Sequence, residues 1–365
     1  MKLEFIELAL SKEFKMSELC RKYGITRPTA YKWLARYREE GVDGLIETSR
    51  RPHHSPNRIE ANEVELILQT REKFPCWGGR TLRQYLINEG HQNLPCESTF
   101  NRTLHKHGKI LPEESEKRQP FIRFEREKPN ELWQMDFKGH FRTLEGRCHP
   151  LTILDDHSRF SLCIKAFAGE TFVNVRQALE DVFRSYGLPN EMTMDNGSPW
   201  KGNPPFTLSR LTVWMMRLGI KVRHSAPYHP QTQGKEERFH RTFKKEVLSL
   251  YQFRGLKDAQ VHFDDWREIY NYHRPHQGIG LQRPADRYLP SERKFIEVLP
   301  PLEYGLEDIV RKVQASGTVS YKDKPYFVGE HLRGEYVALR RSCKEGVFDV
   351  YYGEVKISRV NIRRN

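Results

Sequence analysis

The sequence predicts a multidomain chain in which α-helical units precede an α/β core and a small all-β carboxy-terminal domain. Three observations predict this order: helical periodicity within the first 110 residues, alternating apolar and polar residues from Leu132, and short strand-like segments joined by turns from residue 311. At 365 residues the chain is too long for one ordinary core, and about 150 residues per domain predicts two to four domains.

The charge balance favours a polyanionic partner over an acidic small molecule. Lys and Arg number 61 against 48 Asp and Glu, which gives a formal net charge of +13. A merely soluble basic protein fits the charge as well, so motifs have to decide. The six cysteines form no C-x-x-C pair, which argues against a zinc site and a disulfide framework. No leader opens the sequence and no apolar run approaches the ~18 residues of a membrane span, so we expect a cytoplasmic, nucleoid-associated protein.

The first helical unit, residues 1–47, has the pattern of a helix-turn-helix. Ser17 and Thr26 each precede a helical stretch and can cap it, Gly24 turns the chain between them, and Pro28 falls in a first turn, where proline is tolerated. On the second helix one stripe is apolar, and Thr29, Lys32 and Arg36 fall on the opposite side. Together with Arg27, these residues are the predicted DNA contacts. A helical hairpin with a solvated basic face is the alternative interpretation.

Two proline-containing linkers and a second helical unit follow. Residues 48–59 form a linker in which Arg50 and Arg51 are predicted to lie along a phosphate backbone. Residues 60–111 hold three helical stretches and predict a second helix-turn-helix-like DNA-binding domain. Residues 112–130 form the second linker.

The core, residues 131–290, begins with a strand whose two faces differ. Trp133, Met135 and Phe137 fall on one face, whereas Gln134 and Asp136 fall on the other. Two further apolar segments flank a tight turn at residues 155–158, where aspartate is favoured for structural reasons. A helix at 171–186, a strand at 191–195, a helix at 208–218, a strand at 220–224 and a long helix at 234–250 follow. The order βββαβαβα is the ribonuclease-H-like arrangement. Residues 305–365 predict a small β-barrel that binds DNA.

Three carboxylates in this core suit metal-dependent phosphodiester chemistry. Asp136 lies on the polar face of the first strand, Asp195 ends a strand and is followed by turn residues, and Glu237 lies in the first turn of the long helix. Two Mg²⁺ ions roughly 3.5–4 Å apart can activate a nucleophile and stabilise the leaving oxygen, and hard Mg²⁺ prefers oxygen ligands. We therefore predict Asp136, Asp195 and Glu237 as catalytic metal ligands.

Helix phase separates Glu237 from its neighbour Glu236. Glu236 falls in the apolar stripe with Phe239 and Phe243, whereas Glu237 lies between Arg241 and Lys244. An ordinary surface ion pair of Glu237 with Arg241 is the alternative. The stretch 217–245 holds eight Lys or Arg against two acids, and we predict DNA contacts from Lys235, Arg238, Arg241 and Lys244.

Five ordered motifs resemble the retroviral-integrase-type core of bacterial insertion-sequence transposases, and specifically the insertion-sequence 481 family. They are WQMDF (133–137), LDDHSR (154–159), MDNGSPW (194–200), PYHPQTQGKEERFHR (227–241) and YHRPH (272–276). The glutamate of that family is the third residue after the glycine of its Gln-x-Gly motif, which here is Glu237. The interval between Asp195 and Glu237 is longer than in integrases in general, and helix-turn-helix units replace the zinc-binding amino-terminal module of retroviral integrases.

The resemblance implies a DDE transposase that binds the terminal inverted repeats of a mobile element and joins its 3′ ends to target DNA. It implies two Mg²⁺ ions, for which Mn²⁺ can substitute, and a homodimer or larger assembly on DNA. Two rivals stay open: a nuclease of the same fold that cuts without joining, and a non-enzymatic DNA-binding regulator.

Overall fold

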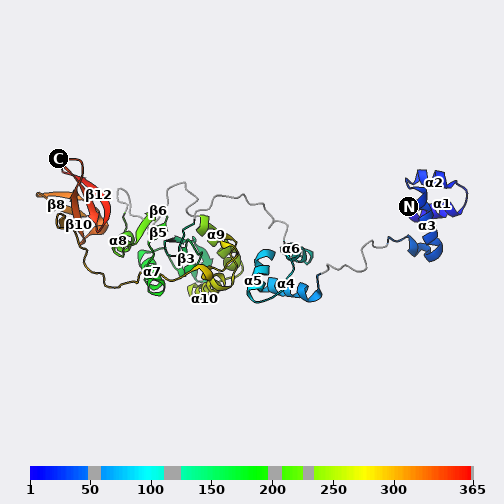
Figure 1. Cartoon of the computed structure of the whole chain (residues 1–365), viewed down its shortest axis with the longest axis horizontal. Coiled ribbons are helices and arrows are strands. Elements are labelled where there is room, and N and C mark those ends of the chain that lie inside the picture. The colour runs from blue at the N-terminus through cyan, green and yellow to red at the C-terminus, as the bar shows by residue number, and fades with distance from the viewer. Residues whose placement is uncertain (48–58, 111–124, 196–207, 225–233, 363–365) are drawn as a thin grey trace. The chain divides into compact units, whose positions relative to one another are not determined.

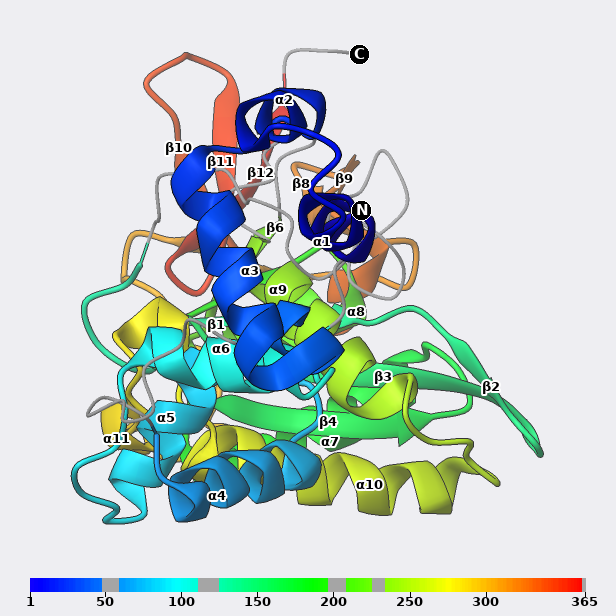
Figure 2. The same ribbon diagram turned by 90° about the vertical axis from the view of Figure 1, so that its right-hand side faces the viewer.

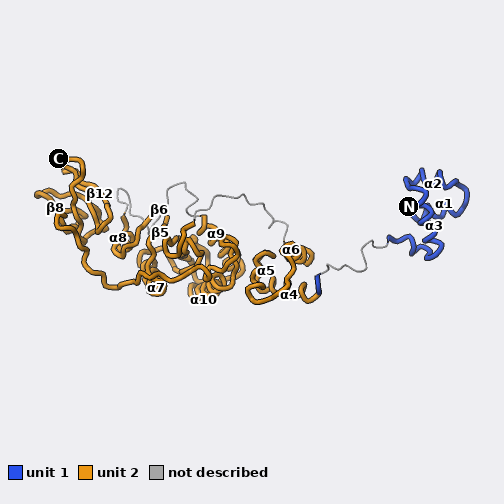
Figure 3. Tube along the Cα trace, viewed as in Figure 1, with its two compact units in different colours: residues 1–60 blue, residues 61–365 orange. Residues whose placement is uncertain are grey.

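A computed structural model describes residues 1–47, 59–110, 125–195, 208–224 and 234–362 of the chain (Figure 1). The chain divides into two compact units, residues 1–60 and 61–365 (Figure 3), and each is described by itself. Among the helices of these ranges, none is both long and apolar enough to cross a membrane.

The first unit is a small helical domain built around a turn. It comprises α1 (Lys2–Leu10), α2 (Met16–Lys22), α3 (Arg27–Glu40) and the 3₁₀ turn η1 (Gly41–Leu45). Gly24 adopts a φ of +64° between α2 and α3, a conformation that glycine reaches without strain, and Thr26 precedes α3 as predicted. Ser17 is not a cap, because α2 already begins at Met16 after Lys15. The apolar stripe of α3 packs into the core through Ala30 and Leu34.

The second unit opens with three more helices at the predicted places. They are α4 (Ala61–Lys73), α5 (Gly79–Asn88) and α6 (Glu97–Lys106). Phe74 and Trp77 stack with their ring centroids 3.8 Å apart, and Tyr85 meets both rings edge-on. This aromatic cluster joins the end of α4 to α5.

The core is a mixed six-stranded sheet. Its strands are β1 (Leu132–Phe137), β2 (Phe141–Thr143), β3 (Gly146–Asp155), β4 (Ser161–Phe167), β5 (Glu191–Met194) and β6 (Lys221–His224). Neighbours run β2-β3-β1-β5-β6, with β4 on β3; the pairs β1–β3 and β3–β4 are antiparallel, and β1–β5 and β5–β6 are parallel. Figure 2 shows the long β3 running beside β4. Only the short β2 was not expected.

Helices cover both faces of the sheet and divide its core in two. Alternate β1 residues such as Trp133 and Met135 pack against α7 (Phe172–Tyr186) and α8 (Arg210–Arg217). The other face packs against α9 (Gly234–Phe243) and α10 (Leu256–Glu268). The predicted faces of β1 and the ribonuclease-H-like α/β class are therefore confirmed.

Two of the core helices change their hydrogen-bonding pattern near their ends. The expected continuous helix 234–250 passes into the π-helical η3 (Lys244–Leu248), and α10 passes into the π-helical η4 (Ile269–His273). Glu246 on η3 joins the two, because it accepts hydrogen bonds from the Trp266 indole at 2.9 Å and from Arg274 at 3.1 Å. The short elements η5 (Gln277–Ile279) and α11 (Pro284–Arg287) follow.

The carboxy-terminal part is all-β, as predicted. It contains β7 (Ile309–Lys312), β8 (Thr318–Tyr321), β9 (Lys324–Phe327), η6 (Glu330–Leu332), β10 (Tyr336–Arg341), β11 (Val347–Tyr352) and β12 (Val355–Asn361). Within the described residues these strands form a four-stranded antiparallel sheet, β12-β11-β10-β7, and a separate β8–β9 hairpin. Hydrogen bonding therefore does not close them into one ladder, and the closed barrel stays a prediction.

Candidate active site

The sheet brings two of the predicted carboxylates together. β1 and β5 are neighbouring parallel strands in which Gln134 faces Thr193, and Asp136 and Asp195 each come two residues later. Both aspartates thus lie at the carboxyl ends of adjacent strands, the edge where open α/β sheets place their ligands. The structure thus places Asp136 beside Asp195, as the sequence predicted.

The environment of Asp136 disfavours its negative charge. Burial is the main cause, and repulsion from Asp195 adds to it, so that the pKa of Asp136 is raised to about 7. A buried carboxylate beside a second carboxylate is stabilised by a bound cation or by a proton. Such a pair is typical of a site that binds a divalent cation.

Hydrogen bonds through Thr152 connect helix α9 to the backbone of Asp136. The Thr152 hydroxyl donates to the backbone oxygen of Asp136 at 3.0 Å and lies 2.7 Å from Nε2 of His240. Because the one hydroxyl hydrogen is used in the first bond, Nε2 of His240 carries the proton in the second. Burial lowers the pKa of His240 to about 3, so the ring is neutral, and its Nδ1 lies 3.9 Å from Oδ2 of Asp136.

The third predicted carboxylate, Glu237, does not lie beside the two aspartates in the structure. The Glu237 side chain is 74% exposed, and Oε1 lies 3.7 Å from the Arg241 guanidinium. Glu236 is buried instead, and its pKa is raised well above the usual range by burial and by repulsion from Asp136 and Asp195. Helix phase correctly predicted which glutamate is buried, and the charges of Asp136 and Asp195 act on this buried glutamate. The role of Glu237 stays a prediction.

The donor set of the site fits hard divalent cations. All its carboxyl groups offer oxygen ligands, and Oε1 of Glu236 is buried without a hydrogen-bond partner. Among the residues that the structure describes, no three Asp, Glu, His or Cys side chains already form a ready ligand set. The residues that would hold the ions therefore lie near one another without converging on a single point.

A second acidic cluster, at the turn after β3, is structural as predicted. Oδ1 of Asp155 accepts bonds from the Ser158 backbone N–H at 2.8 Å and from its hydroxyl at 2.6 Å, and Oδ2 accepts the Asn130 N–H. Oδ2 of Asp156 accepts the N–H of Arg126 at 2.8 Å. These bonds hold the turn and the segment that leads into β1.

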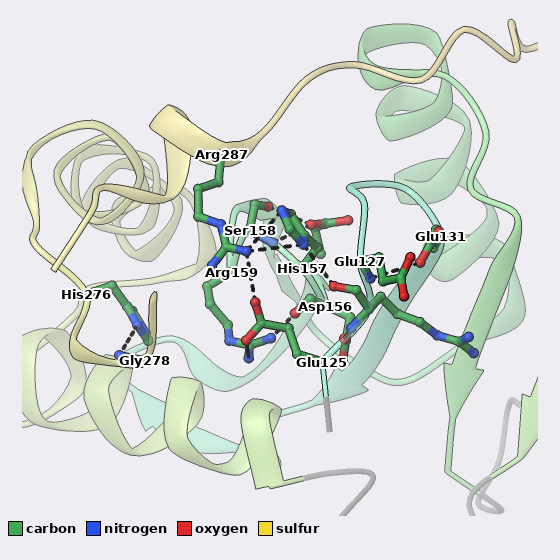
Figure 4. Close-up of polar contacts among 12 residues, drawn as sticks. Glu125, Glu127, Glu131, Asp156, His157, Ser158, Arg159, His276, Gly278 and Arg287 are labelled. Carbon is green, nitrogen blue, oxygen red and sulfur yellow. Dashed lines mark hydrogen bonds and ion pairs between the residues drawn. The ribbon is translucent and has the colours of Figure 1, made fainter. Parts of the chain in front are cut away.

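Charged side chains surround this turn in Figure 4. The Arg159 guanidinium donates to the backbone oxygen of Asp156 and lies 3.4 Å from Glu125, which also pairs with Arg287 at 2.9 Å. Arg287 in turn lies 3.1 Å from Nε2 of His157. The LDDHSR motif is thus explained by internal contacts.

The structure places Lys235 in an internal ion pair. Its ammonium group lies 2.5 Å from Oδ1 of Asp156, and the side chain is only 13% exposed. Burial, together with the nearby Arg159, lowers the pKa of Lys235 to about 8. The sequence did not predict this pair, because the excess of cations around Lys235 suggested an outward role. The ion pair argues against the predicted DNA contact of Lys235.

The other predicted DNA contacts occupy different surroundings. Arg241 and Lys244 are exposed, and Arg238 is half-buried. On α3, Arg27 and Lys32 are exposed, whereas Thr29 and Arg36 are half-buried. Arg50 and Arg51 lie outside the described residues.

Family models match successive parts of the chain. Two models described as integrase core domain match residues 126–230 and 218–284. A helix-turn-helix domain matches residues 1–53 and a homeodomain-like domain matches residues 29–104. The carboxy-terminal domain of the IS481 family transposases matches residues 308–365.

Curated relatives include insertion-element and retroviral proteins. An IS407 protein of Burkholderia multivorans is 26% identical over 66% of this chain and 84% of its own length. An IS476 protein of Xanthomonas euvesicatoria is 31% identical over 43% of this chain and 44% of its own length. The Pro-Pol polyprotein of feline foamy virus is 27% identical over 53% of this chain and 17% of its own length.

Solved structures that resemble the chain are retroviral integrases, at low scores. The catalytic core of HTLV-2 integrase in complex with magnesium is 15% identical, covers 44% of this chain and 97% of its own, and has a TM-score of 0.33. The core of BIV integrase is 25% identical over 43% of this chain and 92% of its own, also with a TM-score of 0.33.

The family models follow the same order as the elements of the fold. Helix-turn-helix matches cover the amino-terminal helices, integrase-core matches cover the mixed sheet and α9, and the family-specific match covers the carboxy-terminal strands. These matches identify an integrase-type core of the DDE transposase class, followed by a carboxy-terminal domain similar to that of the IS481 family transposases.

Proposed function

We propose that the chain binds the terminal inverted repeats of its mobile element, cleaves the 3′ ends and transfers them into target DNA. The observation that carries the proposal is the placement of Asp136 and Asp195 side by side at the carboxyl ends of β1 and β5, with α9 fastened beside them through His240. Glu237, at the start of α9, is the third carboxylate.

The proposed chemistry needs two Mg²⁺ ions, or Mn²⁺ in their place, held by Asp136, Asp195 and Glu237. Bound ions would activate the attacking oxygen and neutralise charge on the transferred phosphate. The described part of the site offers carboxylates and no serine or tyrosine nucleophile at this edge of the sheet, so transfer is direct and forms no covalent protein–DNA bond.

DNA binding is divided among the parts of the chain in this proposal. The two helical domains, residues 1–47 and 60–111, read the ends of the element, with Arg27, Lys32 and Arg36 on the first. Arg238, Arg241 and Lys244 hold the DNA backbone beside the carboxylates, and the basic domain at 305–365 adds contacts. Because two ends must be joined, the active form is a homodimer or larger assembly on DNA in the nucleoid.

A joining assay tests this function. The full-length chain is incubated with Mg²⁺, a labelled duplex that carries the inverted repeats flanking its own gene, and a target duplex. We expect joined products, which Asp195→Asn and Glu237→Gln each abolish while end binding persists in a gel-shift assay. Asp265→Asn, an exposed acid on α10, is the matched control and should join normally.

The rivals predict other products. Cleaved ends without any joined strand would favour a nuclease of the same fold. End binding without either product would favour a regulator. A fully active Asp195→Asn variant would overturn the metal-site assignment.

A further inference from the structure

Glu236 is a buried carboxylate that the proposed triad does not use. Only 4% of the residue is exposed, and its Oε1 is buried without a hydrogen-bond partner. Burying a carboxylate without donors or a cation is expensive, so native proteins seldom retain one that nothing compensates. The packing alone would accept an apolar residue here, because Glu236 shares its stripe of α9 with Phe239 and Phe243.

Glu236 lies on the face of α9 that contacts the strand carrying Asp136. His240 lies one helical turn further on the same face, where it bonds Thr152 and comes within 3.9 Å of Asp136. The preceding turn of this face therefore lies along the same sheet edge.

Neighbouring cations on α9 are engaged elsewhere. Lys235 pairs with Asp156, and Arg241 pairs with Glu237. On the strand side Lys138 favours the charge of Asp136, whereas Glu170 opposes it. Lys235 and Arg241, on the same helix, thus pair with carboxylates other than Glu236.

We propose that Glu236 is a further metal-ligating carboxylate of the active site, sharing a divalent cation with Asp136 and Asp195. The inference rests on the proposed function, because it takes the ion to be the one that serves strand transfer. Four carboxylates carry four negative charges and match two divalent cations, so that the site approaches neutrality before the DNA phosphate enters. Glu237 then stands at the exposed rim beside Arg241.

The test measures metal binding directly, apart from catalysis. Full-length wild type, Glu236→Gln, Glu236→Asp and the control Asp265→Asn are titrated with Mn²⁺ by calorimetry, and their thermal unfolding is followed with and without Mn²⁺. We expect Glu236→Gln to weaken Mn²⁺ binding by about tenfold or more and to raise the metal-free Tm, because it removes a buried charge. Glu236→Asp should retain part of the affinity, and Asp265→Asn all of it.

Wild-type Mn²⁺ affinity in a folded Glu236→Gln protein would overturn the inference, and the proposed function would stand if that variant still joined DNA. Loss of Mn²⁺ binding in Glu236→Gln would support the inference even if the wild-type chain only cut DNA, and in that case the strand-transfer proposal alone would fail. A lower metal-free Tm in Glu236→Gln with unchanged Mn²⁺ affinity would assign Glu236 to packing and contradict the proposal.

Discussion

Two acidic clusters, one buried and one partly buried, lie near Gln134 and Asp136 of β1, and their carboxylates have opposite surroundings. At Gln134, the side-chain amide donates to Asp156, whose carboxylate also receives Lys235 and the Arg126 N–H. At Asp136, the neighbours are further carboxylates, Asp195 and Glu236. The first cluster is satisfied by the protein itself, whereas the second accumulates negative charge.

The difference separates structural from functional acids. Buried carboxylates with a donor for each oxygen stabilise a turn, and their structural role is evident from the hydrogen bonds alone. Buried carboxylates that repel one another cost stability and persist because a bound ligand compensates them. Substitution should therefore have opposite effects on stability in the two clusters.

The largest effect is expected on catalysis at Asp136. Asp136→Asn removes a metal ligand and should lower the rate of strand transfer about 10³-fold or more, because a bound metal contributes several kcal/mol to the transition state. End binding in a gel-shift assay should be unchanged. If Asp136→Asn transferred strands at the wild-type rate, Asp136 would not be a metal ligand, and the two clusters would not differ in function.

In the satisfied cluster, breaking the Asp156–Lys235 pair should destabilise the fold. Lys235→Met leaves the buried Asp156 carboxylate without its cation, and we expect a loss of about 3 kcal/mol in urea unfolding at pH 7. The double variant Asp156→Asn/Lys235→Met should recover part of that loss, because it leaves no buried charge unpaired. Additive losses in the double variant would show that the two groups do not act as a pair.

In the charged cluster, the pH dependence of stability should have the opposite sign from an ordinary paired acid. The folded pKa of Asp136, about 7, exceeds the reference value of 3.8, so between these values the folded state holds a proton that the unfolded chain has released. Its contribution to stability is therefore lost as pH rises from about 4 to 7.

Urea unfolding in EDTA at pH 5 and pH 8 measures this contribution. Relative to wild type, Asp136→Asn should gain about 2 kcal/mol at pH 8 and much less at pH 5. Millimolar Mg²⁺ should reduce the gain, because the ion stabilises the charged wild-type site. An equal effect of the substitution at both pH values would contradict the raised pKa.

The smallest expected effect is on the salt dependence of DNA binding, which should differ between the largely buried and the exposed cations that follow residue 234. Arg241→Gln and Lys244→Gln should each weaken DNA binding and reduce the slope of log K against log salt by about one, since each removes a phosphate contact. Lys235→Gln should leave that slope unchanged, as should Lys257→Gln, an exposed control on α10. A reduced slope in Lys235→Gln would show that Lys235 contacts DNA after all.

Local patterns determined most of the fold. Alternation along β1 correctly assigned Trp133 and Met135 to one face and Asp136 to the other, because side chains of a strand alternate by geometry. Gly24 and Thr26 marked the boundary between α2 and α3 for the same local reason. The π-helical end of α9 was not foreseeable, since it depends on Glu246 reaching Trp266 and Arg274 far along the chain.

By itself the sequence determined the order of the domains, the ribonuclease-H-like core, and the meeting of Asp136 with Asp195, because these follow from periodicity and from the parallel pairing of two strands. Only the tertiary structure decided the partners of the residues at the start of α9. Helix phase showed that Glu236 turns inward and Glu237 outward, but it did not show that Lys235 is also largely buried, nor which groups these side chains meet. Asp156 and Asp136 are brought to those side chains by packing between segments about 80 to 100 residues apart, which no local pattern records.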